Sequence, residues 1–376
     1  MLPRLFDELR DECDYDRRRK DIADFNDASE THLRGLAMSP VKFGISFTRR
    51  AMNQANALVN VYEDGSVIVS TGATEMGQGV NTRIRQIVAD DLGVAYDSVL
   101  VTTTSTDKNN NTSPTAASSG TDLNGAAAAV ACGKIKDRLR GVAAGLLADK
   151  DLGMTAEPDA IDFADGYAFD TRRPGKKLPF RDVCCAAYEQ RVSLGERGHY
   201  ATPGVDYNRD TGKGNPFLYF TNGVACTEVE VDRFTGQMQV VRADILMDVG
   251  ESLNPGIDRG QIIGGFVQGM GWCTTEELVY GGDGTLKSYS PTTYKIPNIS
   301  DVPTALNVRF LHNPDNHISV KRSKALGEPP LLLGLSAWLA AKDALRSAGF
   351  DGVLDLPATG ERLTMALATS GVKALV

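Results

Sequence analysis

The segment Ala57-Leu-Val-Asn-Val-Tyr62, followed by Asp64-Gly65 and Val67-Ile-Val-Ser70, decides the fold class of this chain. Both apolar runs are rich in residues that favour strands, and Asp-Gly is a typical two-residue hairpin turn. These residues therefore predict an antiparallel hairpin. Apolar residues then recur at helical spacing from Val80 to Leu92, and Gly93 is a typical helix stop.

The same order of elements occurs twice along the chain. A strand over 98–104 and a long helix over 123–147 complete the first set, and the second set is expected at 224–231, 238–249, 258–278, 306–310, 318–321 and 330–347. A chain of 376 residues also exceeds the size at which one hydrophobic core usually stops growing. The sequence predicts an α+β fold of two mixed-sheet lobes with helices, an internal duplication with sub-lobes at about 40–205 and 206–376.

Composition and charge exclude several classes of protein. The chain has 42% hydrophobic and 23% charged residues and a net charge of -8, which argues against a nucleic-acid or anionic-membrane partner. The strongest charge run, Arg17 to Lys20, predicts the solvated face of an amphipathic surface helix over 2–20. No apolar stretch is long enough to cross a membrane, and the 6 cysteines lack a disulfide framework. We expect a cytoplasmic protein with reduced thiols and no zinc site made of histidines.

Two loops have residues suited to ligand binding, and each also has a purely structural interpretation. Glu75-Met-Gly-Gln-Gly79 is either a plain strand-to-helix turn or a ligand loop. In the second case Gly77 and Gly79 permit close backbone approach, Gln78 supplies an amide, and the helix N-terminus adds unpaired N–H groups. Thr112-Ser-Pro-Thr-Ala-Ala-Ser-Ser-Gly120 is either an anion cradle or a connector to a helix capped by Thr121 or Asp122.

Two segments of the second half also have two interpretations. Gly264-Gly-Phe-Val-Gln-Gly-Met-Gly271 places glycines in a predicted helix, each costing up to about 1 kcal/mol relative to alanine. This indicates close approach by another backbone or by a flat ligand, which Gln268 would contact. Gly327-Glu-Pro-Pro330 is expected to end a strand and start a helix, with Pro329 keeping Glu328 out of the α region. Glu328 is then either a general base on a stiff hinge or a glutamate that interacts with the helix dipole.

Taken together and in this order, these segments resemble the molybdopterin-binding portion of the xanthine dehydrogenase and aldehyde oxidase family. The resemblance runs from Leu2 to about Phe350. Besides the four segments above, the matching motifs within it are 42–48, 111–125, 215–217, 223–226, 247–250, 294–297 and 323–330. Within the family, Phe43-Gly-Ile-Ser-Phe-Thr48, Thr112 to Ser118 and the paired prolines after Glu328 are similar to the xanthine branch. The match implies the C-terminal half of the molybdenum-cofactor-binding subunit or domain.

The resemblance implies a specific chemistry for these residues. Molybdenum would be held by the dithiolene of a pterin, with no side-chain ligand, and hypoxanthine or xanthine would be hydroxylated to urate with water as the oxygen source. Glu328 matches the general base of the family. The matches at the cofactor are Gly77, Gln78, Gly79, Ala117, Ser118 and Gln268. The matches at the substrate are Phe47, which could flank a flat purine ring, and Thr48, Ala116 and Ala117.

The resemblance also implies partners, because several parts of the family have no counterpart in this sequence. These are the N-terminal half of the molybdenum-binding domain, with its glycine-rich loop and its purine-orienting arginine and glutamate, and the 2Fe–2S and FAD domains that pass electrons to NAD. We therefore expect a dimeric holoenzyme in which this chain is inactive alone. Hydroxylation of an aldehyde or another N-heterocycle, or a non-catalytic assembly module, remain the alternatives.

Overall fold

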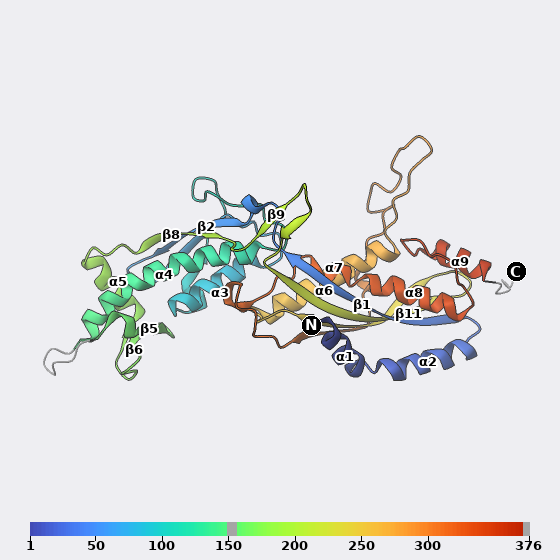
Figure 1. The fold of residues 1–376 in the computed structure, drawn as a ribbon, viewed down its shortest axis with the longest axis horizontal. Coiled ribbons are helices and arrows are strands. Elements are labelled where there is room, and N and C mark those ends of the chain that lie inside the picture. The colour runs from blue at the N-terminus through green and yellow to red at the C-terminus, as the bar shows by residue number, and fades with distance from the viewer. Residues whose placement is uncertain (149–155, 371–376) are drawn as a thin grey trace. The chain divides into compact units, whose positions relative to one another are not determined.

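The computed structural model describes residues 1–148 and 156–370, and the chain divides into two units (Figure 1). Unit 1 contains Met1–Phe43, Phe220–Asp315 and the chain from Lys324 onward, and unit 2 contains Gly44–Tyr219 and Asn316–Ser323. The N-terminal segment belongs to unit 1 because strand β1 (His32–Ile45) pairs with β11 (Tyr219–Asp232). The sub-lobes predicted at about 40–205 and 206–376 follow the chain order, and so they did not include the pairing of β1 with β11.

The main sheet of unit 2 is built on the predicted hairpin. Its strands lie in the order β4 (Val99–Val101), β3 (Val67–Thr71), β2 (Gln54–Val61) and β8 (Gly195–Ala201). Helices α3 (Val80–Leu92) and α4 (Gly120–Leu147) pack beside it and share its apolar core. A Cβ on Gly198 of β8 would overlap the carbonyl oxygen of Ala127, so the lack of a side chain lets α4 lie directly on the sheet.

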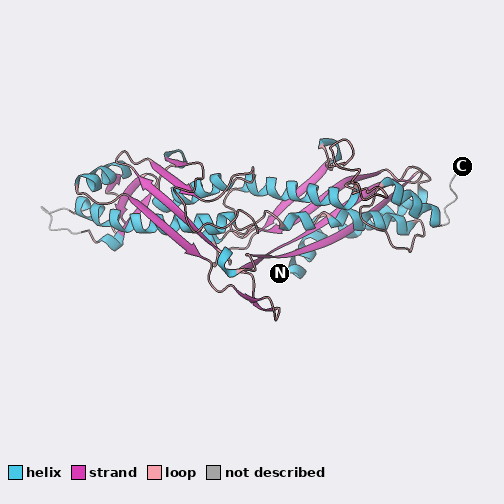
Figure 2. Cartoon of the chain, turned by 90° about the horizontal axis from the view of Figure 1, so that it is seen from above, coloured by secondary structure: helices cyan, strands magenta, loops and turns pink. Residues whose placement is uncertain are grey.

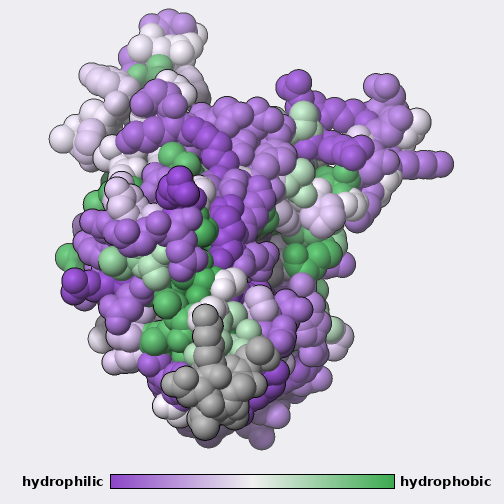
Figure 3. All heavy atoms as spheres, turned by 90° about the vertical axis from the view of Figure 1, so that its left-hand side faces the viewer, coloured by the Kyte–Doolittle hydropathy of each residue, from purple (hydrophilic) through white to green (hydrophobic). Residues whose placement is uncertain are grey.

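The rest of unit 2 occupies a sequence region without clear periodicity. It forms a sheet of β5 (Ile161–Ala164), β6 (Tyr167–Asp170) and β7 (Lys177–Pro179), the helix α5 (Phe180–Glu189), and a pair of β9 (Asp206–Asn208) with β10 (Lys213–Asn215). Figure 3 views this end of unit 2, where hydrophilic side chains cover most of the visible surface.

The sheet of unit 1 is covered by helices on both faces. Its order is β1, β11, β12 (Met238–Asp248) and β13 (Ala305–Leu311). Figure 2 draws strands in magenta and helices in cyan. Ala225 and Ile245 face a core with α6 (Pro255–Thr274), α8 (Leu335–Ser347) and α9 (Gly360–Thr369). Val224 and Leu246 face a second core with α1 (Leu2–Glu12) and α2 (Tyr15–Ala28). Burial of both faces explains why the strand residues are apolar without alternation.

The predicted α+β fold with mixed sheets is confirmed, and the duplication is visible in the strand pairing. In each unit an antiparallel hairpin is followed by a helix and by a strand that runs parallel to the second hairpin strand: β3 with β4, and β12 with β13. A further helix then follows, which is α4 in unit 2 and α8, after the short α7 (Pro329–Leu332), in unit 1.

The predictions for the segments 2–20 and 318–321 were wrong. The helix predicted over 2–20 breaks at Cys13 and Asp14, where Asp14 has φ 54°, and α2 then lies along the sheet. Arg18 is consequently buried and donates hydrogen bonds to Glu228 at 2.7 Å and Asp244 at 2.8 Å, so the charge run is not wholly solvated. The strand predicted at 318–321 is instead a single 3-10 turn, Val320–Arg322, because Lys321 and Arg322 have positive φ.

Candidate functional site

The predicted site residues are divided between the two units. Glu328 and Gln268 belong to unit 1, and the remaining predicted residues belong to unit 2. Each group is described within its own unit.

In unit 2, the loop between β3 and α3 is organised around the carboxylate of Glu75. Its oxygens accept hydrogen bonds from the backbone N–H groups of Gly77 and Gly79 at 2.9 Å and of Asn81 at 3.0 Å. Although burial raises the pKa of Glu75, these hydrogen bonds together lower it below its ordinary value. The prediction of unpaired N–H groups for an anion at this helix N-terminus was wrong for these donors, because Glu75 already occupies them.

Gln78 is held in the same loop by both ends of its amide. Its Oε1 accepts from the N–H of Met76 at 2.6 Å, and its Nε2 donates to the carbonyl of Thr74 at 2.8 Å. The loop backbone can turn this tightly because Gly77 (99°) and Gly79 (76°) have positive φ, a conformation that residues with side chains rarely adopt. The second Nε2 hydrogen and the second Oε1 lone pair remain available by valence for a bound molecule.

The loop at 112–120 lies beside the loop at 75–79. The N–H of Thr74 donates to Thr115 Oγ1 at 3.0 Å, and the nearest neighbours of Gly120 include Thr115 and Val80. Ala117 and Ser118 have φ values of 52° and 55°. Two successive left-handed residues other than glycine are strained, and such strain is common at binding loops. Unit 2 thus brings the two predicted cofactor loops together.

Phe47 and Thr48 follow β1 and are half-buried. The buried side chain of Asn53 accepts from the N–H of Phe47 and donates to its carbonyl, both at 2.8 Å. Arg209, from the loop between β9 and β10, donates to Thr48 Oγ1 at 3.4 Å. The 47–48 segment is therefore positioned by Asn53, while Arg209 lies next to Thr48.

A buried acid follows the 112–120 loop directly. Asp122, in the first turn of α4, accepts a hydrogen bond from the Tyr219 hydroxyl at 2.6 Å. Burial raises the pKa of Asp122 to about 7, although the hydrogen bond from Tyr219 favours the charged form. The folded state therefore retains a proton that the unfolded chain releases near pH 3.8, so the contribution of Asp122 to stability decreases as the pH rises from about 3.8 to about 7.

In unit 1, the turn that carries Glu328 is fixed by contacts before it. Lys324 donates its N–H to the carbonyl of Val249 at 2.9 Å and its Nζ to the buried Asp248 at 2.6 Å. The hydroxyl of Thr221 donates to the carbonyl of Ala325 at 2.8 Å. These bonds hold residues 324–325 against the ends of β11 and β12. The segment before Glu328 is therefore not the predicted strand.

Glu328 itself is exposed and forms the N-cap of α7. Its φ and ψ are -99° and -38°, within the α region, so the prediction that Pro329 excludes this conformation was wrong. The Glu328 carbonyl accepts from the N–H of Leu331 at 3.1 Å, and both prolines are buried, so the packed turn outweighs the steric preference before proline.

The glycines of α6 pack against the segment after Glu328. A Cβ on Gly265 would lie 3.0 Å from Pro330 Cβ, and one on Gly269 would overlap the Leu331 carbonyl oxygen. Close approach by another backbone therefore explains these two glycines. Gly264 has no atom within 4 Å of its Cβ position, and the exposed Gln268 lies one turn further along the same helix face. This face of α6 is open.

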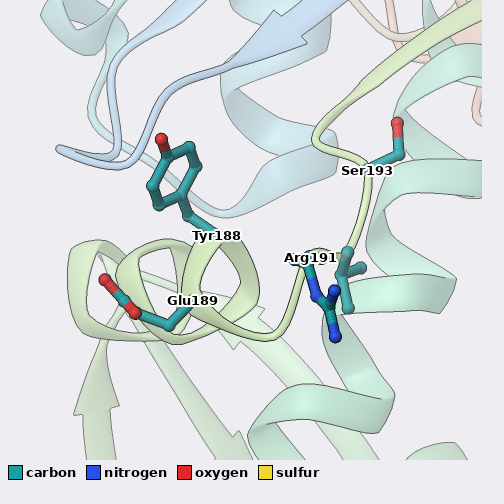
Figure 4. Close-up of a pocket in the computed structure, with 5 residues that line it drawn as sticks. Tyr188, Glu189, Arg191 and Ser193 are labelled. Carbon is teal, nitrogen blue, oxygen red and sulfur yellow. The ribbon is translucent and has the colours of Figure 1, made fainter.

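Other possible centres are weaker. Within residues 1–148 and 156–370, no group of three or more His, Cys, Asp or Glu side chains is arranged to hold a metal ion. A hollow of about 520 Å³ lies at the end of α5, beside Tyr188, Glu189, Arg191 and Ser193. The side chains point away from one another in Figure 4, so they do not converge on a ligand. Among the same described residues, no helix combines the length and apolarity needed to cross a membrane.

The order of motifs and the fold agree with comparisons to known proteins. Residues 8–303 match the molybdopterin cofactor-binding domain family. The xanthine dehydrogenase of Dictyostelium discoideum is 41% identical over 372 residues, and the xanthine dehydrogenase/oxidase of Gallus gallus is 43% identical over 368 residues. Each alignment covers 96% of this chain. The chain belongs to the molybdopterin cofactor-binding domain family. It spans about 25% of the length of these two relatives.

Solved structures support the same family fold. Quinoline 2-oxidoreductase from Pseudomonas putida 86 is similar with a TM-score of 0.84 and 25% identity, over 98% of this chain and 46% of that chain. The CO dehydrogenase of Oligotropha carboxidovorans has a TM-score of 0.83 and 22% identity, over 98% of this chain and 45% of that chain. At 22% identity, the similarity to this CO dehydrogenase shows a shared fold and nothing more. The predicted family and cofactor-domain fold are confirmed.

Sequence reasoning missed the residues that hold the family motifs in place. Glu75 was noticed only as the first residue of its loop, and Asp122 only as a helix cap. An acid two residues before Gly-x-Gly at a helix start is a signal that could have identified Glu75, because free N–H groups at that position attract a carboxylate. No local signal in the sequence links Arg209 with Thr48, which lies 161 positions earlier.

Proposed function

We propose that this chain is the molybdopterin-binding part of an enzyme that hydroxylates xanthine or hypoxanthine. The observation that carries the proposal is the 41% and 43% identity to xanthine dehydrogenases over 96% of this chain. Because the chain spans a quarter of those relatives, the activity requires further polypeptide: the other half of the molybdenum-binding domain, and 2Fe–2S and FAD domains that pass electrons to NAD. The isolated chain is expected to be inactive.

The residues of unit 2 fit a cofactor whose metal is held by its own organic ligand. Such a group needs hydrogen-bonding and small side chains, not a cluster of metal ligands. The half-buried Gln78 provides an amide, and Gly77 and Gly79 have no side chain of their own to block approach to the loop. The small Ala117 and Ser118 occupy an adjacent strained turn. Gln268 on the open face of α6 is the proposed contact from unit 1. When bound, the molybdenum cofactor supplies the two-electron redox chemistry.

The substrate and the proton would be handled by other residues of this chain. Phe47 flanks the flat purine ring, Thr48 bonds its heteroatoms, and the small side chains of Ala116 and Ala117 leave room for it. Glu328 acts as the general base that removes the proton from the attacking oxygen. Its backbone is fixed on both sides, by the Lys324 and Ala325 bonds and by packing on α6, so a carboxylate there is pre-positioned for proton transfer.

Replacing Glu328 by glutamine in the assembled enzyme, purified with its accompanying polypeptide, tests this role. General-base removal should lower kcat for xanthine by about 100- to 10,000-fold. Molybdenum and pterin content should remain unchanged, because Glu328 does not hold the cofactor. Glu30→Gln, at an exposed glutamate of the same unit, is the matched control. Normal turnover by Glu328→Gln would exclude it as the base.

A second substrate class is supported by the likeness to quinoline 2-oxidoreductase, a protein named for an N-heterocycle other than a purine. Steady-state kinetics with xanthine, hypoxanthine, quinoline and an aldehyde separate the two. A kcat/KM that is highest for xanthine or hypoxanthine supports the purine proposal, and a higher value for quinoline or the aldehyde contradicts it. Absence of molybdenum from the assembled protein would instead favour a non-catalytic module.

A further inference from the structure

The segment that follows α6 exposes an unusual number of large apolar side chains. Between residues 276 and 299, which we call the arm, these are Leu278, Val279, Tyr280, Tyr289, Ile296 and Ile299. Tyr289 is 78% exposed and Ile299 is 90% exposed. In Figure 1 the chain after α6 projects beyond the helices of unit 1. Large apolar side chains that are exposed together on one segment commonly mark an interaction surface.

The arm is ordered at its base. Both of its ends pack on Gly271 of α6, where a Cβ would overlap Glu276 Oε1 and the Pro297 ring. The hydroxyl of Thr275 donates to the carbonyl of Lys295 at 2.9 Å. Hydrogen bonding with the nearly buried Glu276 raises the pKa of Tyr294, which ties the arm back to its own root.

The outer part of the arm is also locally bonded. The N–H of Gly281 donates to the Thr285 carbonyl at 2.8 Å, and the N–H of Lys287 donates to the Val279 carbonyl at 2.7 Å. The apolar side chains are thus presented on a pre-formed backbone. Pre-formed segments lose less conformational entropy on association than flexible ones.

The charges of the arm argue against a lipid surface. Lys295 is paired with Asp301 at 2.5 Å, and Lys287 has Asp283 nearby in sequence. Segments that bind anionic membranes need an excess of unpaired basic residues. An aromatic and aliphatic surface with few free charges is instead typical of the centre of a protein–protein interface.

We infer that the arm docks on the part of the enzyme's molybdopterin-binding polypeptide that lies outside this chain. This inference rests on the proposed function, and it assigns a role to the 294–297 motif, to which the proposed function gives none. The length of the relatives supports this occupant: the matched region is 46% of the quinoline 2-oxidoreductase chain and about 25% of the two xanthine dehydrogenases. More than half of the similar solved chain is therefore polypeptide against which an apolar arm can pack.

A photo-crosslinking amino acid at position 289 tests the occupant directly. The full protein, with the polypeptide that accompanies it in its source, is irradiated and its crosslinked peptides are identified by mass spectrometry. The same substitution at Tyr188, an exposed tyrosine of unit 2, is the matched control. Peptides of the molybdopterin-binding polypeptide outside this chain, crosslinked from 289 and not from 188, are the expected result. Crosslinks to a second copy of this chain or to lipid, or a yield no higher than the control, would overturn the inference.

The double variant Tyr289→Ser and Ile299→Ser supplies a second measurement. Loss of two exposed apolar side chains should weaken the association of this chain with the molybdopterin-binding polypeptide outside it by at least about tenfold. Far-UV circular dichroism and thermal unfolding of the chain should not change, because both side chains are exposed. Undiminished association in the folded variant would also overturn the inference. The proposed function is judged separately, by the turnover and metal content of Glu328→Gln.

Discussion

Replacing Gly269 by alanine tests how closely α6 positions the Glu328 turn. The new Cβ would lie 2.8 Å from the Leu331 carbonyl carbon and would overlap the oxygen of that group, whereas ordinary contact begins at 3.4 Å. Both elements are backbone, so no side-chain rotation relieves the overlap and α7 must move away. Overpacking of this kind costs about 1–3 kcal/mol, and the better helix propensity of alanine offsets about 1 kcal/mol of that cost. We expect a net loss of up to about 2 kcal/mol in the free energy of unfolding.

Gly264→Ala is the matched control, because it lies in the same helix and has no atom within 4 Å of its Cβ position. It should stabilise the protein by up to about 1 kcal/mol. Urea unfolding followed by tryptophan fluorescence is the appropriate assay, since both tryptophans, Trp272 and Trp338, belong to unit 1. In the assembled enzyme Gly269→Ala should also lower kcat for xanthine while the molybdenum content is retained. If Gly269→Ala were as stable as Gly264→Ala, the argument that α6 packs directly on the Glu328 turn would be refuted.

Three further predictions concern residues whose structural role sequence reasoning missed or misassigned. Between pH 5 and pH 8, the unfolding free energy of wild type should fall by roughly 3 kcal/mol more than that of Asp122→Asn. The reason is that folding raises the pKa of the Asp122 carboxyl to about 7, whereas the asparagine amide does not titrate. If urea unfolding gave the same loss of unfolding free energy between the two pH values for wild type and Asp122→Asn, this assignment would be contradicted. Arg18→Leu should destabilise unit 1 by about 1–3 kcal/mol, because Glu228 and Asp244 lose a buried hydrogen-bond donor while Arg242 stays beside Asp244 at 2.8 Å and Arg34 lies 4.0 Å from Glu228. The exposed Arg17→Leu should change stability by less than about 0.5 kcal/mol. Similar fluorescence-monitored midpoints for the two would disprove the buried network. Glu75→Gln should make the Gly77, Gly79 and Asn81 amides exchange hydrogen several-fold faster at neutral pH, because a neutral amide is a weaker acceptor than a carboxylate. Exchange rates like those of the exposed-site control Glu63→Gln would remove Glu75 as the organiser of its loop.

Much of the fold was accessible from local patterns. The Asp64-Gly65 turn between two β-rich runs predicted the β2–β3 hairpin, and helical spacing predicted α3 and most of α4, because these elements are determined by neighbours in sequence. The errors occurred where distant contacts prevailed. Arg18 was assigned to solvent because its neighbours are charged, and only packing of α2 on β11 and β12 brings it to Glu228 and Asp244.

The candidate site shows the same division. The sequence by itself determined the family, because motifs in a fixed order along the chain depend on residue identity alone. Tertiary structure decided which interpretation of each motif holds. Positions 265 and 269 need glycine because Pro330 and Leu331 lie against them. The amide N–H groups of Gly77 and Gly79 are unavailable to an anion because they already donate to Glu75. Such competition between partners arises only when the chain is folded, since it depends on distances that no spacing in the sequence encodes.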